Sequence, residues 1–134
     1  MIVLAGLVQL AVALSSIAIP RLLGWRQEVA VLKPLTRRIF WTYSGYILGI
    51  HIWFALVSIF CAAELTGGSR LAAFVTGFIS LYWLVRVIGQ FTWYDRSIAS
   101  TRLLFRLAEI AYVTAFTSLT IVYGWAAVGN VWAS

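Results

Sequence analysis

Cysteine, histidine and methionine are almost missing from this chain of 134 residues, which has one of each. A single cysteine, Cys61, forms no intramolecular disulfide and no Cys-x-x-Cys redox pair. A single histidine, His51, excludes a metal site built from several histidines of one chain. These absences remove several classes of enzyme and metalloprotein, and we expect no metal site.

Charged residues are also scarce, at 10% of the sequence, whereas 63% of the residues are hydrophobic and the mean hydropathy is +0.95. Soluble domains average about 25% charged residues, so this composition excludes a water-soluble globule. The net charge of +6 does not indicate nucleic-acid binding, because most basic residues lie in two short stretches between apolar runs. The composition predicts a single integral membrane domain over residues 1–134.

Catalytic motifs are missing as well. The sequence has no Gly-x-x-x-x-Gly-Lys phosphate loop and no His-Glu-x-x-His zinc motif. Ser44 and His51 stand two helical turns apart, which is too far for a nucleophilic Ser–His dyad. We therefore expect a role other than catalysis.

Four apolar runs are long enough to cross a bilayer as helices, since about 20 residues span a hydrocarbon core of roughly 30 Å. They cover residues 1–19, 39–63, 71–94 and 103–127. Ala11 and Ala13 resemble a signal-peptide cleavage site, but no basic residue precedes the first run, so we expect a retained helix that ends before Pro20. The sequence predicts an all-α, antiparallel bundle of four transmembrane helices.

The basic residues predict the orientation of this bundle. Five lie between the first and second runs, where a short surface helix is expected, and Arg96 and Arg102 lie between the third and fourth. The positive-inside rule places these two connections in the cytoplasm and both chain ends on the non-cytoplasmic side. We expect a multi-pass protein of the bacterial inner membrane, in contact with lipid and with itself or other membrane subunits.

Two opposite charges occur inside the third and fourth runs. Measured from the connecting loop at 1.5 Å per residue, Arg86 lies about 13 Å deep and Glu109 about 9 Å deep. The similar heights predict an ion pair within a polar intramembrane cluster of Arg86, Gln90, Glu109 and Tyr112. Such a cluster fits a polar pocket or ion path, or a buried pair that fixes helix register.

His51 lies near the middle of the second run, on the same helical face as Ser44. A neutral imidazole at this depth bonds a hydroxyl of another helix, relays protons, or ligates haem or chlorophyll. One chain lacks a second histidine for bis-histidine haem. The structural role is therefore favoured, and the other two stay open.

The opposite face of the second run carries Gly45 and Gly49 in a Gly-x-x-x-Gly step. Small residues four apart allow two helices to approach closely in lipid. The step fits helix packing inside one chain and fits oligomerisation equally well.

Three functions remain open on this sequence. The first is a non-catalytic subunit of a homo- or hetero-oligomeric membrane complex, which is favoured because so little of the chain lies outside the apolar runs. The second is a small oligomeric transporter or channel with a polar path at Arg86, Gln90 and Glu109. The third is a haem-binding, pigment-binding or lipid-processing membrane protein that uses His51.

Overall fold

The computed structural model describes residues 1–93 and 103–134, and these are almost entirely helical. Four helices are long and apolar enough to cross a membrane: α1 (Ile2–Leu22), α3 (Pro34–Phe60), α5 (Arg70–Thr92) and α6 (Leu103–Ala133). Two short helices, α2 (Trp25–Ala30) and α4 (Ala62–Leu65), lie in the connections. A helical protein with four candidate membrane spans is thereby confirmed. The basic residues Arg96 and Arg102 lie outside the described residues.

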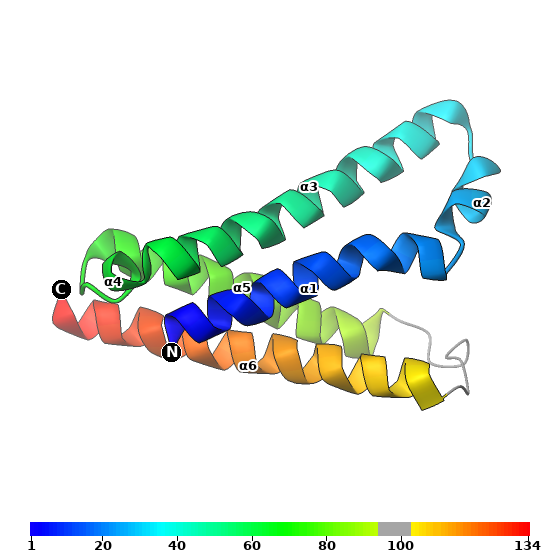
Figure 1. The fold of residues 1–134 in the computed structure, drawn as a ribbon. Coiled ribbons are helices and arrows are strands. Elements are labelled where there is room, and N and C mark those ends of the chain that lie inside the picture. The colour runs from blue at the N-terminus through cyan, green and yellow to red at the C-terminus, as the bar shows by residue number, and fades with distance from the viewer. Residues whose placement is uncertain (94–102) are drawn as a thin grey trace.

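The long helices form two antiparallel hairpins, α1 with α3 and α5 with α6 (Figure 1). The hairpins meet where α1 packs against α6. Both chain ends lie at one end of the bundle, and α2 lies at the other (Figure 1). Toward α2, the α3 helix diverges from α5 and α6, so the bundle is tighter at the end that holds the termini.

The helix ends differ from the predicted ones for local reasons. Pro20 lies inside the last turn of α1, where its missing N–H removes a single backbone hydrogen bond without ending the helix. The chain then turns at Gly24, whose φ of 66° favours glycine. Pro34 begins α3 five residues before the predicted start, because the fixed φ of proline suits the first helical position.

Buried side chains gather toward the end of the bundle that holds the chain termini. The buried residues of α1 lie between Ile2 and Ala13, and those of α3 lie between His51 and Ser58. No residue from 34 to 50 is buried. The first half of α3 therefore contributes almost nothing to the core of this chain.

The α1 and α3 helices approach each other closely at Gly6. A Cβ atom added there would lie 2.9 Å from Ser58 Cβ and 2.9 Å from Ile59 Cγ1, and 3.2 Å from the carbonyl oxygen of Ala55. Real Cβ atoms do not make such short contacts, so the two helices pack directly against each other through this glycine. Small residues serve the same purpose in other membrane helix pairs.

Replacing Gly6 by alanine is therefore expected to push α1 away from α3. We expect Gly6→Ala to lower the free energy of unfolding by about 1–3 kcal/mol, the usual cost of overpacking. The measurement is thermal unfolding in detergent, followed by tryptophan fluorescence. Gly129→Ala is the matched control, because a Cβ at Gly129 meets nothing within 4 Å. Equal stability of the two variants would contradict the close contact.

Candidate functional site

A layer of hydrogen-bonded polar side chains crosses the interior of the bundle, and each long helix contributes one member. The members are Gln9 of α1, Ser58 of α3, Trp83 of α5 and Tyr123 of α6, all 0% exposed. Gln9 Nε2 donates to Tyr123 Oη at 2.6 Å and to Ser58 Oγ at 3.4 Å. Trp83 Nε1 donates to Gln9 Oε1 at 3.0 Å, and the Ser58 and Tyr123 hydroxyls bond each other. We call these four residues the polar layer.

The polar layer is closed on itself. Both ends of the Gln9 amide are used, and the indole N–H and the two hydroxyls all find partners inside the layer. Water is missing from a bilayer core, so a buried polar group there needs a protein partner. Each interhelical hydrogen bond in a membrane contributes about 0.6 kcal/mol on average. The layer therefore holds the four helices in one register.

His51 lies beside this layer and is 2% exposed. Its Nε2 and the Tyr82 hydroxyl are 2.8 Å apart, and its ring stacks on Trp83 with centroids 4.9 Å apart. The other ring nitrogen, Nδ1, is buried without a hydrogen-bond partner. Axial ligation of haem or chlorophyll needs an accessible nitrogen, but Nε2 is engaged by Tyr82 and one ring face is covered by Trp83. This geometry favours the structural role of His51.

Ser44, the second residue predicted for a proton relay, is not joined to His51. Its hydroxyl donates to the Phe40 carbonyl one turn earlier in α3, at 2.9 Å. Serine commonly makes this bond to its own helix in apolar surroundings. A direct relay between the two side chains therefore has no support in the described residues.

Arg86 does not form the predicted ion pair with Glu109. Within residues 1–93 and 103–134, no ion pair joins the two, and the Arg86 guanidinium instead lies over the Phe116 ring, 5.5 Å from its centroid. Arg86 Nε is buried without a partner. A charge near the bilayer centre costs about 2.5–3.5 kcal/mol on insertion scales. A desolvated cation–π contact returns about 2 kcal/mol, so Phe116 offsets only part of this cost.

The pairing of α5 with α6 accounts for the separation of the two side chains. Trp83 stacks on Phe116 with ring centroids 5.1 Å apart, and Ser80 Oγ donates to the Thr120 carbonyl at 2.8 Å. In antiparallel helices a step forward along one matches a step back along the other, which places Glu109 level with Gln90. Arg86 lies four residues away, or about 6 Å along the axis. Heights counted from the loop gave an offset of about 4 Å, which is smaller.

No hydrogen bond or ion pair joins the other members of the predicted cluster in the described residues. The Tyr112 hydroxyl bonds the Ser15 hydroxyl of α1, while its ring packs on Phe116, which Arg86 also contacts. Gln90 and Glu109 are half-buried, and neither forms a hydrogen bond or an ion pair within the part of the chain that the structure describes. The four residues are therefore not joined into one hydrogen-bonded cluster there.

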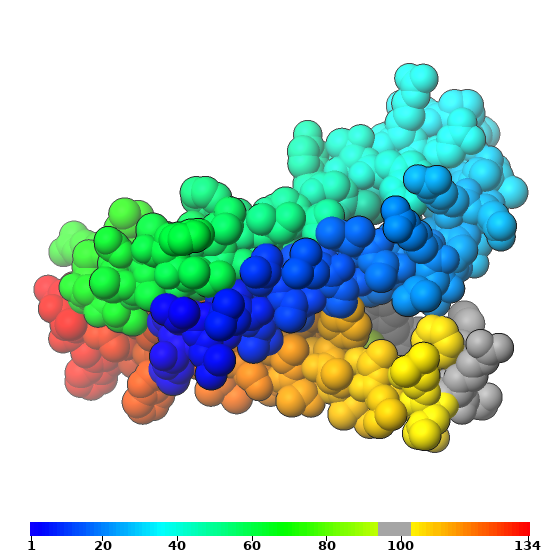
Figure 2. All heavy atoms as spheres, in the orientation of Figure 1, coloured from blue at the N-terminus to red at the C-terminus, as the bar shows by residue number. Residues whose placement is uncertain are grey.

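The predicted packing step at Gly45 and Gly49 is not used inside this chain. A Cβ atom at either position would meet nothing within 4 Å. Both glycines are exposed, on the opposite side of α3 from buried His51 and Ser58. Figure 2 shows the corresponding cyan half of α3 standing above the rest of the molecule. Packing within the chain is excluded as the reason for this step.

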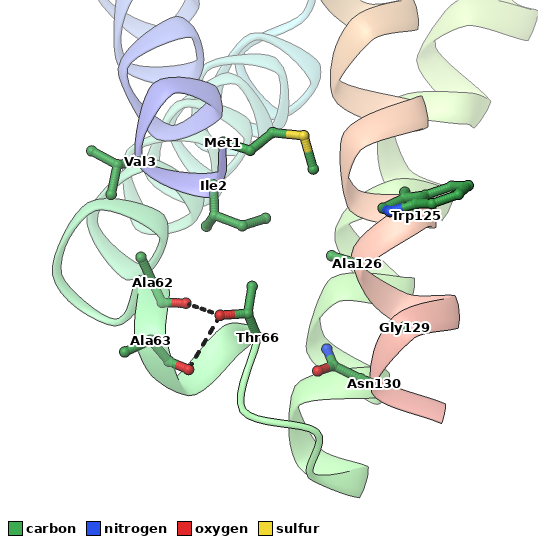
Figure 3. A pocket seen from close by; sticks show the side chains of 10 residues that line it. All are labelled: Met1, Ile2, Val3, Ala62, Ala63, Thr66, Trp125, Ala126, Gly129 and Asn130. Atoms are coloured by element: carbon green, nitrogen blue, oxygen red, sulfur yellow. Dashed lines mark hydrogen bonds between the residues drawn. The ribbon is translucent and has the colours of Figure 1, made fainter. Parts of the chain in front are cut away.

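Two hollows in the described residues are further candidate sites. One, of about 480 Å³, lies near the chain termini between α1, α4 and α6 (Figure 3). Its polar groups are occupied locally: Thr66 Oγ1 donates to the Ala62 carbonyl at 3.0 Å, and Asn130 bonds Gly68 N and the Leu65 carbonyl. The other, of about 330 Å³, is an apolar groove between α3 and α5. No group of three or more potential metal-ligating side chains occurs in the described ranges.

Tyr123 tests the polar layer directly. Tyr123→Phe removes the hydroxyl that accepts from Gln9 and bonds Ser58, so we expect it to lower the free energy of unfolding by about 1 kcal/mol. Reversible unfolding in mixed detergent micelles measures this change. Tyr46→Phe is the control, since Tyr46 is 66% exposed and should be neutral. A Gln9→Leu, Tyr123→Phe double-mutant cycle without coupling would count against the layer.

Comparison with known protein families, with curated proteins and with solved structures finds no match to this chain. Functional inference therefore depends on the geometry of the helices and of the side chains described above.

Proposed function

We propose that the chain is a non-catalytic subunit of an oligomeric membrane complex, and that it contacts a second copy of itself through Gly45 and Gly49 of α3. The supporting observation is the open glycine face, where added Cβ atoms meet nothing within 4 Å. No residue of the first half of α3 is fully buried within its own chain, although Phe40 contacts Trp25 of α2. A half-helix with so little buried surface is available for a shared helix contact.

The close helix packing at Gly6 supports the proposal that Gly45 and Gly49 form a helix contact. At Gly6 the chain shows close packing of two helices through a residue without a side chain. Lipid tails are as apolar as leucine, so apolar area alone does not drive helices together in a membrane. Close backbone approach supplies dispersion contacts instead, and a Gly-x-x-x-Gly step provides the flat surface for it. Gly45 and Gly49 of α3 provide such a surface, and no side chain or helix of this chain covers it.

The remaining alternatives have weaker support. A transport path at Arg86, Gln90 and Glu109 needs polar groups in sequence across the membrane, but these three are not linked in the described residues. A haem or pigment role needs an accessible nitrogen on His51, but Nε2 bonds Tyr82 and the unpaired Nδ1 is buried. The subunit role requires neither arrangement.

The proposal also includes the orientation of the chain and the membrane that contains it. Four basic residues occur between the end of α1 and the second turn of α3, namely Arg26, Lys33, Arg37 and Arg38, with Arg21 inside the last turn of α1. Positive residues of this kind are typical of cytoplasmic connections. We place α2 on the cytoplasmic side of a bacterial inner membrane, with both ends outside.

The glycine face can be tested by substitution with a large residue. Gly49→Leu is expected to block close approach of two α3 helices and to weaken self-association at least about tenfold, or about 1.4 kcal/mol. Energy transfer between labelled copies in liposomes, measured over a range of protein-to-lipid ratios, gives the dissociation constant.

The control for this experiment is Gly129→Leu, which fills an equally open glycine near the end of α6. It should associate like the unmodified chain. A chain that stays monomeric at every protein-to-lipid ratio, or equal weakening by both substitutions, would overturn the proposal.

A further inference from the structure

Arg86 is a half-buried cation without a counter-charge in the described residues. Among residues 1–93 and 103–134 its guanidinium forms no hydrogen bond and no ion pair, its Nε is buried, and it lies over the Phe116 ring. The position is five residues, or about 8 Å, from the midpoint of α5. The contact with Phe116, which stacks on Trp83, keeps the guanidinium next to the aromatic core. The site therefore has a positive charge to be neutralised.

A second unfilled polar atom lies close by. His51 Nδ1 is buried without a partner, on a residue that is 2% exposed. Whichever tautomer is present, one nitrogen bonds the Tyr82 hydroxyl and the other has no partner. Trp83 stacks on both His51 and Phe116, and the Arg86 guanidinium lies over Phe116. The two unfilled groups thus border one stack of aromatic rings.

An apolar groove lies between α3 and α5, one to three turns from His51 and Arg86 along the two helices. It has a volume of about 330 Å³ and is lined by Ile50, Trp53, Phe54, Val57, Phe74, Val75, Phe78 and Ile79. Phe54 lies between the groove and Tyr82, because its ring centroid is 5.2 Å from that of Tyr82 and 6.0 Å from that of Phe78. The backbones of α3 and α5 barely approach each other, and aromatic side chains bridge the space between them.

We propose that Arg86 and this groove bind a long-chain fatty acid, with the carboxylate on the guanidinium and the acyl chain between α3 and α5. A carboxylate matches the planar guanidinium in two parallel hydrogen bonds and neutralises its charge. Arg86 and Phe74 are twelve residues apart, or about 18 Å along α5, which suits a long acyl chain. The groove lining carries no charge, as an acyl chain requires.

The depth of Arg86 favours a fatty acid over an anionic phospholipid. In a helix, long side chains lean toward the N-terminus, which directs Arg86 further toward the middle of α5. A phospholipid phosphate is tied to the headgroup region by its glycerol, whereas a fatty acid carboxylate has no such tether. The proposal does not depend on the glycine face, since Gly45 and Gly49 are not among the residues that line the groove.

The test compares a bromine-labelled stearic acid with its methyl ester, using the full chain in nanodiscs of zwitterionic lipid. Bromine quenches tryptophan fluorescence on contact, and Trp53 lines the groove. We expect saturable quenching by the acid and at least about tenfold weaker binding of the ester. Arg86→Gln should weaken binding of the acid to the level of the ester, while Arg106→Gln, a charge on the exposed start of α6, should not.

Val75→Phe fills the groove and should weaken binding of acid and ester alike, whereas Val128→Phe, at an exposed position of α6, should have no effect. Thermal unfolding of each variant confirms that it is folded. Equal binding of acid and ester, or unchanged binding of the acid by Arg86→Gln, would overturn the proposal. Tighter Arg86-dependent quenching by a brominated anionic phospholipid would overturn it in favour of a lipid headgroup.

Discussion

The hydrogen-bonded polar layer of Gln9, Ser58, Trp83 and Tyr123 is the interaction on which the rest of the structure depends. Its members come from four different helices, and each is fully buried. Apolar side chains alone cannot specify one helix arrangement in lipid, because they are equally well solvated by acyl chains. Hydrogen bonds have direction and fixed length, so the layer selects one rotation for each helix.

Several other features follow from the position of this layer. The layer draws α1 and α3 together next to Gly6, and it fixes Trp83 as the platform on which both His51 and Phe116 stack. Arg86 then takes its place over Phe116 at the edge of the same aromatic column. The aromatic column therefore extends from the polar layer to the Arg86 guanidinium.

The sequence was enough to predict the four apolar spans, but it was not enough to predict the contacts between them. Runs of about 20 apolar residues between basic connections are a strong signal, because the cost of burying unpaired backbone or charge in lipid is large. Arg86 and Glu109 form no ion pair, because the relative height of two residues on neighbouring helices depends on how α5 and α6 pair. No local sequence pattern encodes that pairing. The role of Trp83 in the polar layer was not predicted, because a tryptophan in an apolar run is typical of a packed core or of a membrane interface. The signal was its indole N–H, which needs an acceptor when buried.

The same reasoning applies to the glycines. Gly45 and Gly49 form a recognised motif and yet contact nothing, whereas Gly6, which belongs to no motif, makes the tightest contact between α1 and α3. A spacing rule identifies a surface that permits close approach. Whether another helix occupies that surface depends on the direction in which the rest of the chain holds it.

The separation of the chain into two helical hairpins has a consequence for how the protein is made. Each hairpin satisfies its own backbone and leaves few polar side chains exposed to lipid, so each can enter the membrane as a unit during synthesis. The residues of the polar layer are divided between them, Gln9 and Ser58 in the earlier hairpin and Trp83 and Tyr123 in the later one. The buried hydrogen bonds between the two pairs therefore form only after the last of the four long helices has been inserted.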